Sequence, residues 1–336
     1  MRPGATKEEP MLSPAPLRQI LFCIAVVWSA EASAQAYPSR PITLVAPFAA
    51  GSGVDVMARR IAANLSPRLG QPIIVDNKPG AGSVIGTEFV VKAAPDGYTL
   101  MLTASLLSVL PGLYKNLPFD PVTDLTHISK FGTGGVALLV NPRVLPVKSL
   151  DELVARARAQ PGKLSFSSSG NGTPHHLGME ALKDRFGLDI VHVPYRGSPA
   201  ALNDLVAGHV HMALFPVNAC LPQIKSGDLT LLAISTKDRA LFGLKAPSFE
   251  ELGLKKLESD LEIYFLLSGP AKLPPEITQR WNREIGIMLD TPEQRDRLLA
   301  MSVIPERSTP EAMSAQVAAD VTRWKSFMAA HKITAE

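Results

Sequence analysis

Two short stretches of the sequence join an apolar, strand-like run to a helical pattern through a glycine-rich turn. They read APFAAGSGVDV (residues 46–56) and SSSGNGTPHHLG (residues 167–178). Glycine lets the backbone approach a ligand closely, and the helix that follows directs unpaired N–H groups and about half a positive charge to the same point. Such a helix start binds an anion without arginine or lysine. The chemistry that these residues suit is therefore the capture of a negatively charged molecule.

The candidate binding groups are the backbone N–H groups of both turns and the hydroxyl groups near them. The turns are Gly51-Ser52-Gly53 and Gly170-Asn171-Gly172, and the added hydroxyl groups belong to Ser168, Ser169 and Thr173. His176, in the first turn of the second helix, is a further candidate. Either turn alone is better explained as a tight turn followed by helix-capping residues. Two matched turns in one chain favour a cleft that holds one anion from both sides.

Enzymatic chemistry is supported less well. The run GAGSVIG, residues 80–86, resembles a dinucleotide-binding fingerprint, but residues 76–79 separate it from the preceding strand and no acidic residue follows at the expected distance. The chain has neither a G-x-x-x-x-G-K-S/T phosphate loop nor a G-x-S-x-G nucleophile motif. Asp55 fits a helix N-cap or a first-turn acid better than a general base. We therefore predict no catalytic residues.

The histidines raise the question of a metal site. His209 and His211 form an H-x-H pair on a predicted strand, which would place both rings on one face. No H-E-x-x-H motif or cysteine cluster accompanies them. Surface or capping histidines are the favoured interpretation, and we expect neither a metal nor a cofactor.

The composition is that of an ordinary globular chain. Its 336 residues suffice for two domains or one large one, with 46% apolar and 19% charged residues. The net charge is only +3, which argues against a nucleic-acid partner. Beyond residue 36 the sole cysteine is Cys220, so an internal disulfide is excluded there, and its apolar neighbours predict a buried, unreactive thiol.

Residues 1–36 predict a signal peptide and leader. Arg18 supplies a positive charge, residues 20–30 form an apolar core and Ala32-Ser33-Ala34 is an A-x-A cleavage site. The apolar run is too short to span a bilayer. Either Met1 or Met11 is the start of translation. We expect an exported protein located in the periplasm.

The elements that must position the two turns alternate between strands and helices. The first part of the chain predicts strands at 42–48, 73–75 and 98–103 with helices at 54–65 and 83–94. This order predicts a parallel sheet flanked by helices. The middle part predicts strands at 136–140, 164–167, 190–193, 210–215 and 229–235 and helices after Ser149, at 174–186 and at 199–207. The last third is helical, with helices at 275–289, after Thr291 and after Thr309.

Beyond these patterns, the chain from Tyr37 onward resembles one known family. The segments that carry the resemblance are YPSRPITLVAPFAAGSGVDVMARRIA, LGQPIIVDNKPGAGSVIGTEFV, APDGYTL, SSSGNGTPHHLGMEAL, VHVPYRGSPAALNDLVAGHV and IKSGDLTLLAIS. They are similar, in order, to the Bug-type solute-binding proteins of tripartite tricarboxylate transporters.

The resemblance implies an α/β fold, the two-lobed type II periplasmic binding protein or Venus flytrap, in which each lobe is a sheet flanked by helices. Lobe 1 would comprise residues 37–137 plus 260–336, and lobe 2 residues 138–259. The chain would capture a small organic carboxylate between the lobes and deliver it to membrane transporter subunits or a sensor. The alternative is an exported α/β hydrolase-like or nucleotide-using enzyme.

The resemblance also implies the residues that surround the ligand. The first loop would add Phe48, Ala49, Ala50 and Asp55, and the cleft would further be lined by Ser105, Tyr195 and Phe215. The family often has an acidic residue where Phe215-Pro216 stands, and such an acid can pair with a ligand ammonium group. We therefore expect a mono- or dicarboxylate with an apolar body, and expect amino acids to bind poorly.

Overall fold

The protein is described by a computed structural model that covers residues 1, 4, 37–195 and 197–334. It divides into two compact units, Met1–Ser39 and Arg40–Glu336, and the fold described below is that of the second. The predicted signal peptide lies outside the described residues apart from Met1 and Gly4.

The first sheet has six strands in the order β11-β4-β10-β3-β1-β2. Its strands are β1 (Ile42–Ala46), β2 (Ile73–Asn77), β3 (Thr99–Ala104), β4 (Leu125–Gly134), β10 (Ile263–Pro270) and β11 (Val303–Pro305). β1 pairs in parallel with β2 and β3, as predicted. β10 runs antiparallel to β3 and β4, and β11 antiparallel to β4, so the predicted parallel strands form one part of a mixed sheet.

β4 escaped prediction because its sequence does not alternate cleanly. His127, Ser129 and Lys130 are all buried in it, and these polar side chains interrupt the apolar pattern that indicates a strand. Each of the three is satisfied by hydrogen bonds: the His127 ring nitrogens, for example, lie 2.9 Å from Ser268 Oγ and 2.9 Å from the Pro121 carbonyl oxygen. Hydrogen bonds to other segments of the fold allow β4 to bury polar side chains, and a local sequence pattern does not show these partners.

The second sheet has five strands in the order β7-β6-β8-β5-β9. They are β5 (Val136–Val140), β6 (Ser165–Ser168), β7 (Val191–Pro194), β8 (Met212–Pro216) and β9 (Thr230–Ile234). β6 is parallel to β7 and β8, while β5 is antiparallel to β8 and β9. The chain therefore passes from one sheet to the other between Gly134 and Val136, and returns before Ile263.

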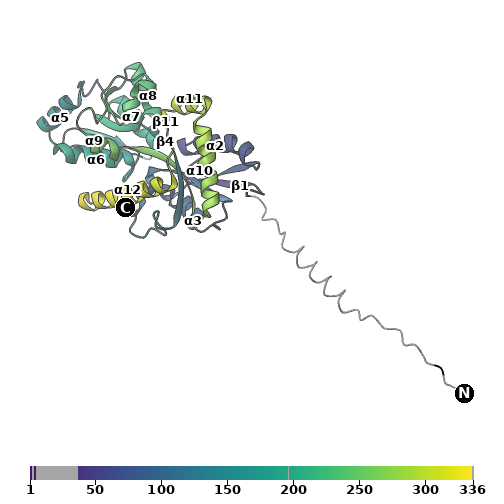
Figure 1. Ribbon diagram of the computed structural model, residues 1–336. Helices are drawn as coiled ribbons and strands as arrows, with labels where there is room; N and C mark the ends of the chain where they lie inside the picture. The colour runs from purple at the N-terminus through teal and green to yellow at the C-terminus, as the bar shows by residue number, and fades with distance from the viewer. Residues whose placement is uncertain (2–3, 5–36, 196, 335–336) are drawn as a thin grey trace. The chain divides into compact units, whose positions relative to one another are not determined.

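Helices surround both sheets. They are α2 (Gly53–Leu69), α3 (Val84–Val91), α4 (Leu110–Leu113), α5 (Leu150–Ala159), α6 (Pro174–Phe186), α7 (Ser198–Ala207), α8 (Val217–Ser226), α9 (Lys255–Asp260), α10 (Pro275–Leu289), α11 (Pro292–Ala300) and α12 (Pro310–His331), with 3-10 turns η1 (Ala81–Ser83), η2 (Ser105–Ser108) and η3 (Lys237–Phe242). Figure 1 shows α5 to α9 gathered at the second sheet and α2, α3 and α10 at the first. The predicted bounds of β5, α6 and α10 are confirmed; α8 was not predicted.

Alternation along β5 builds the core of the second sheet. Val136, Leu138 and Val140 enter an apolar cluster with α5 and α6. Ala137 and Leu139 enter the opposite cluster, with α7 and α8. A strand buried on both faces has this apolar sequence throughout.

Two details of the second half bear on the sequence predictions. Cys220 is fully buried, and burial raises the pKa of its thiol to about 12, which confirms an unreactive cysteine. His209 and His211 precede β8, so their placement on a strand is wrong. His209 pairs with Asp204, and the His211 ring accepts a hydrogen bond from the Ser165 N–H. Within the described part of the chain, no group of three or more His, Cys, Asp or Glu side chains is placed to hold a metal ion.

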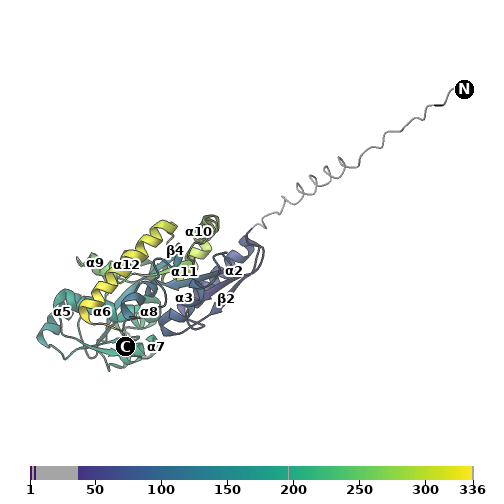
Figure 2. The same ribbon diagram turned by 90° about the horizontal axis from the view of Figure 1, so that it is seen from below.

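α12 links the two sheets. Trp324 and Met328 pack with Val109 and Leu113 near the first sheet and with Leu177 of α6, which covers the second. His331 at the end of α12 lies 3.2 Å from the carboxylate of Asp184 in α6. Figure 2 shows α12 extending to the side of α6.

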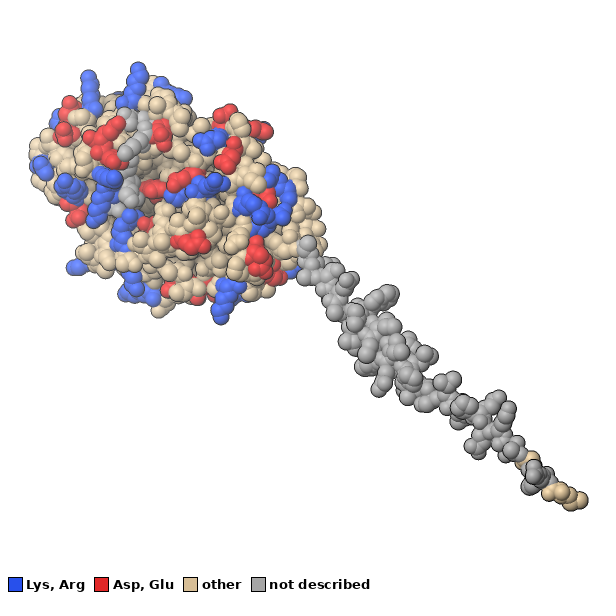
Figure 3. Space-filling view, in the orientation of Figure 1, with Lys and Arg blue, Asp and Glu red and all other residues tan. Residues whose placement is uncertain are grey.

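The surface mixes charges of both signs. Basic and acidic side chains alternate over the face drawn in Figure 3. None of the helices in the described residues is both long and apolar enough to cross a membrane.

The buried His127 predicts a loss of stability in acid. Burial lowers its pKa from 6.5 to about 4, so between these values the unfolded chain binds a proton that the folded chain excludes. The free energy of unfolding should therefore fall as the pH drops from 6.5 toward 4, by about 1.4 kcal/mol per pH unit for this residue. Urea denaturation at pH 7 and pH 5 should give a shallower pH dependence for His127→Gln than for the unsubstituted protein. Equal slopes would contradict the assignment.

Candidate functional site

A cavity of about 350 Å³ opens between the two sheets. The first sheet contributes the β1–α2 junction, η2, β10 and β11 to its lining, and the second contributes the first turns of α6, α7 and α8. The predicted turns at residues 51–53 and 170–172 thus belong to junctions on opposite sides of one cavity.

The first turn is held by a buried carboxylate. Asp55 accepts hydrogen bonds from the Gly51 N–H at 2.8 Å, from Arg59 Nε at 3.1 Å and from Asn77 Nδ2 at 2.9 Å. The Gly51 N–H contributes most to lowering the pKa of Asp55, against the opposing effect of burial. The Asp55 N–H in turn donates to Ser52 Oγ, which caps α2. Asp55 is therefore the first-turn acid that the sequence predicts, and it shapes the loop from behind.

The second turn is held by histidines. The Gly172 N–H donates to His176 Nδ1 at 3.0 Å, and Ser168 Oγ lies 2.7 Å from His192 Nε2. The rings of His176 and His192 stack with centroids 3.9 Å apart. Burial lowers the pKa of both to about 4. Because His176 stays neutral, its Nδ1 can accept the hydrogen bond that fixes Gly172.

Four helix N-termini reach the cavity. First-turn residues of α2, α6, α7 and α8 line it, among them Gly53, His175, Ser198 and Asn218. Each helix start adds a partial positive charge. The described residues that line the cavity include no Lys, Arg, Asp or Glu. The electrostatic character of the site therefore comes from backbone dipoles and neutral polar groups.

The predicted site residues divide into two groups. Phe48, Ser52, Gly53 and Ser105 line the cavity. The other predicted residues are not part of its lining: Ala49, Ala50, Gly51, Asp55, Ser168, Ser169, Gly170, Asn171, Gly172, Thr173, His176, Tyr195 and Phe215.

Tyr195 and Phe215 are engaged within the second sheet's own packing. The Tyr195 hydroxyl donates to Asp204 at 2.6 Å. Phe215 is fully buried, and its ring lies 5.3 Å from that of His175, which does line the cavity. An effect of Phe215 on a ligand would therefore pass through His175.

Sequence reasoning missed several residues of the lining. Ser198 starts α7, and Asn218 is the second residue of the unpredicted α8. Ile263 and Phe265 belong to β10, Val303 starts β11, and Ser302 directly precedes it. The Gly197-Ser198-Pro199 helix start was a usable signal for Ser198. Strands β10 and β11 gave none, because their contribution depends on pairing with β4 far along the chain.

The two sides of the cavity also touch directly. Gly172 has φ +70°, and a Cβ on it would lie 2.0 Å from Cδ2 of Leu113 in α4. The missing side chain therefore makes room for Leu113, and the second turn is seated against the first half of the molecule.

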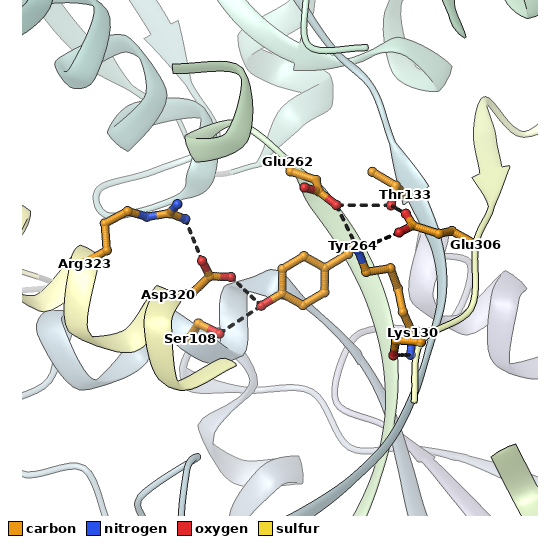
Figure 4. A network of polar contacts seen from close by, with 9 residues as sticks. Ser108, Lys130, Thr133, Glu262, Tyr264, Glu306, Asp320 and Arg323 are labelled. Carbon is orange, nitrogen blue, oxygen red and sulfur yellow. Dashed lines mark hydrogen bonds and ion pairs between the residues drawn. The ribbon is translucent and has the colours of Figure 1, made fainter. Parts of the chain in front are cut away.

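A polar network connects β4 and β10 next to the point where the chain crosses from one sheet to the other (Figure 4). Lys130 of β4 lies 3.1 Å from both Glu262 and Glu306, and its side chain is only 7% exposed. Thr133 donates to Glu306 at 2.7 Å. A buried lysine requires such partners, because an unpaired buried charge is costly.

The same network reaches α12. Tyr264 of β10 donates to Asp320 at 2.7 Å and lies 3.1 Å from Ser108 Oγ. Arg323 lies 2.8 Å from Asp320. Burial, then the Asp320 charge, raises the pKa of Tyr264 well above its usual value, so the hydroxyl remains a donor.

Two helix-flanked sheets with a cavity between them, lined by the first turns of four helices, make up a two-lobed α/β fold. The chain belongs to the tripartite tricarboxylate transporter receptor family, whose model matches residues 57–333.

Individual comparisons agree. Protein BugT of Bordetella pertussis is 36% identical over 298 residues, covering 88% of this chain and 90% of BugT. A solved R. palustris protein with adipate is 31% identical with a TM-score of 0.76, covering 88% and 99% of the two chains. MatC from Rhodopseudomonas palustris with bound malate is 26% identical with a TM-score of 0.72, covering 87% and 99%.

Substitution of Gly172 tests whether its close contact with Leu113 contributes to stability. Gly172→Ala should lower the free energy of unfolding by about 1–3 kcal/mol more than Gly187→Ala. Gly187 is a matched control, since its φ is +62° but a Cβ there meets nothing within 4 Å. Leu113→Ala should lower the free energy of unfolding by less in the Gly172→Ala background than in the unsubstituted protein, because in that background it also removes the clash. Equal losses in both glycine variants, measured by chemical denaturation, would show that the contact is unimportant.

Proposed function

We propose that this chain captures a small organic carboxylate in the cavity between its sheets and presents it to transporter subunits or a sensor in the membrane. The observation that carries the proposal is the convergence of four helix N-termini on one cavity whose described lining is uncharged. Oriented N–H dipoles favour an anion in such a site. Closing two lobes around it excludes water and strengthens each hydrogen bond.

The lining further supports a carboxylate with an apolar body. Phe48, Leu106, Ile263 and Phe265 supply apolar surface beside the polar helix starts. A ligand ammonium group would find no carboxylate among the described lining residues, so amino acids should bind poorly. Phe215, in contrast, is fully buried and does not line the cavity.

The lobes, the predicted site and the route of export complete the proposal. Lobe 1 would be residues 37–137 plus 260–336 and lobe 2 residues 138–259. The strands change sheet close to these boundaries, between Gly134 and Val136 and again before Ile263, and the boundary at residue 137 falls inside β5. Residues of the two turns that do not line the cavity would act by holding the loops. The predicted leader would direct the chain to the periplasm, where the family operates.

A thermal-shift screen tests the ligand class. The purified protein is heated with adipate, malate, simple monocarboxylates, the matching amides and amino acids. A true ligand at 100 times its Kd adds about 2.7 kcal/mol to the free energy of unfolding, roughly several degrees in Tm for a chain of this size. We expect shifts with one or more carboxylates and none with the amides or amino acids. A flat response to every carboxylate would contradict the proposal.

Gly53→Leu tests the location. Gly53 lines the cavity, and a Cβ on it would meet nothing within 4 Å, so the new side chain should occupy the ligand's space without disturbing α2. We expect loss of the carboxylate-induced shift with little change in the Tm of the free protein. Ala63→Leu, on an exposed position of the same helix, is the control and should keep the shift. Retention of the shift by Gly53→Leu would place the ligand elsewhere.

A further inference from the structure

His175 is a buried polar side chain that forms a hydrogen bond within the loop through only one of its two ring nitrogens. It lines the cavity at the start of α6, yet its side chain is enclosed, with the residue only 7% exposed. Its Nδ1 lies 2.8 Å from Ser169 Oγ. Among the residues that the structure describes, no side chain or backbone group forms a hydrogen bond with Nε2. One ring nitrogen is therefore bonded to the protein, and the other has no hydrogen bond to the described residues in a side chain that lines the cavity.

The neighbouring histidine shows the contrast. His176 is equally buried, but its Nδ1 accepts the Gly172 N–H and its Nε2 lies 3.7 Å from Glu180. Both of its nitrogens face the protein, and His176 does not line the cavity. Of two adjacent histidines, His176 holds the turn and His175 lines the cavity.

We propose that His175 is a specificity-determining residue whose neutral imidazole donates a hydrogen bond from Nε2 to an oxygen of the bound carboxylate, with Ser169 as the positioning residue. The inference rests on the proposed function and adds to it a named side-chain donor on the lobe 2 side of the cavity.

The surroundings of the His175 ring bear on its charge and on which nitrogen carries the proton. Phe215 packs against the ring with centroids 5.3 Å apart, and burial lowers the pKa of His175 to about 4. A neutral imidazole has one donor and one acceptor nitrogen. If Ser169 donates to Nδ1, the proton resides on Nε2 and points to the ligand. A carboxylate selects this arrangement, because an unprotonated Nε2 would set a lone pair against its negative charge.

The test compares two substitutions of the same residue. His175→Phe keeps a ring of similar size on Phe215 and removes the donor; His175→Gln keeps an N–H donor. Adipate, malate and any carboxylate positive in the thermal screen are titrated calorimetrically into each protein. A hydrogen bond to a charged group predicts a Kd for His175→Phe raised at least about tenfold, with His175→Gln within about threefold of the unsubstituted protein. Ser169→Ala should show a smaller increase than His175→Phe.

A spectroscopic measurement separates contact from packing. In the nitrogen-15 spectrum of the histidine rings, the signal lost in His175→Phe identifies His175. We expect the complex to hold the proton on Nε2 and the Nε2 signal to move when the carboxylate is added. A proton on Nδ1 in the complex, or an unchanged Kd for His175→Phe, would overturn the inference while leaving the proposed function intact. Failure of the unsubstituted protein to bind any carboxylate would overturn both.

Discussion

The organisation of the site depends on leaving helix N-termini free to face one cavity. A glycine turn before a helix has backbone N–H groups that must find partners, and unsupported it would collapse onto the helix start. Here the turns are held from behind by side chains that never reach the cavity. Asp55 accepts the Gly51 N–H, and His176 accepts the Gly172 N–H. Under the proposed function, the dipoles of these helix starts would then act on an anion in the cavity.

The two turns reach this result by different chemistry. The first uses an ionised carboxylate, and Arg59 beside Asp55 offsets the negative charge that would otherwise weaken the field of α2. The second uses neutral imidazoles, which accept hydrogen bonds without adding charge, so the positive end of α6 is not diminished. Both solutions keep formal charge away from the described lining. If the cavity binds a carboxylate as proposed, it would discriminate between ligands by the direction of its helix dipoles and by its shape.

The strands beside the crossing must be rigid enough to keep the lobes in register. The buried Lys130 with its two glutamates, and Tyr264 with Asp320, join β4 and β10 to α12. α12 in turn contacts α6 through Leu177, which lies one residue after His176. The second loop is therefore connected to the first sheet through packing as well as through the chain, and Leu113 seated against Gly172 adds a direct contact.

By itself, the sequence determined the two turns, the helices that follow them, the parallel part of the first sheet and the family, because these depend on local spacing and short motifs. Only the tertiary structure decided which atoms face the cavity. Gly53 and Gly170 occupy similar turns in the sequence, yet only Gly53 lines the cavity. His175 and His176 are adjacent, yet only His175 lines it. The antiparallel β4 and β10 and the contribution of Asn218 likewise depended on partners distant in the chain. Side-chain direction is set by packing against such partners, and no local pattern records it.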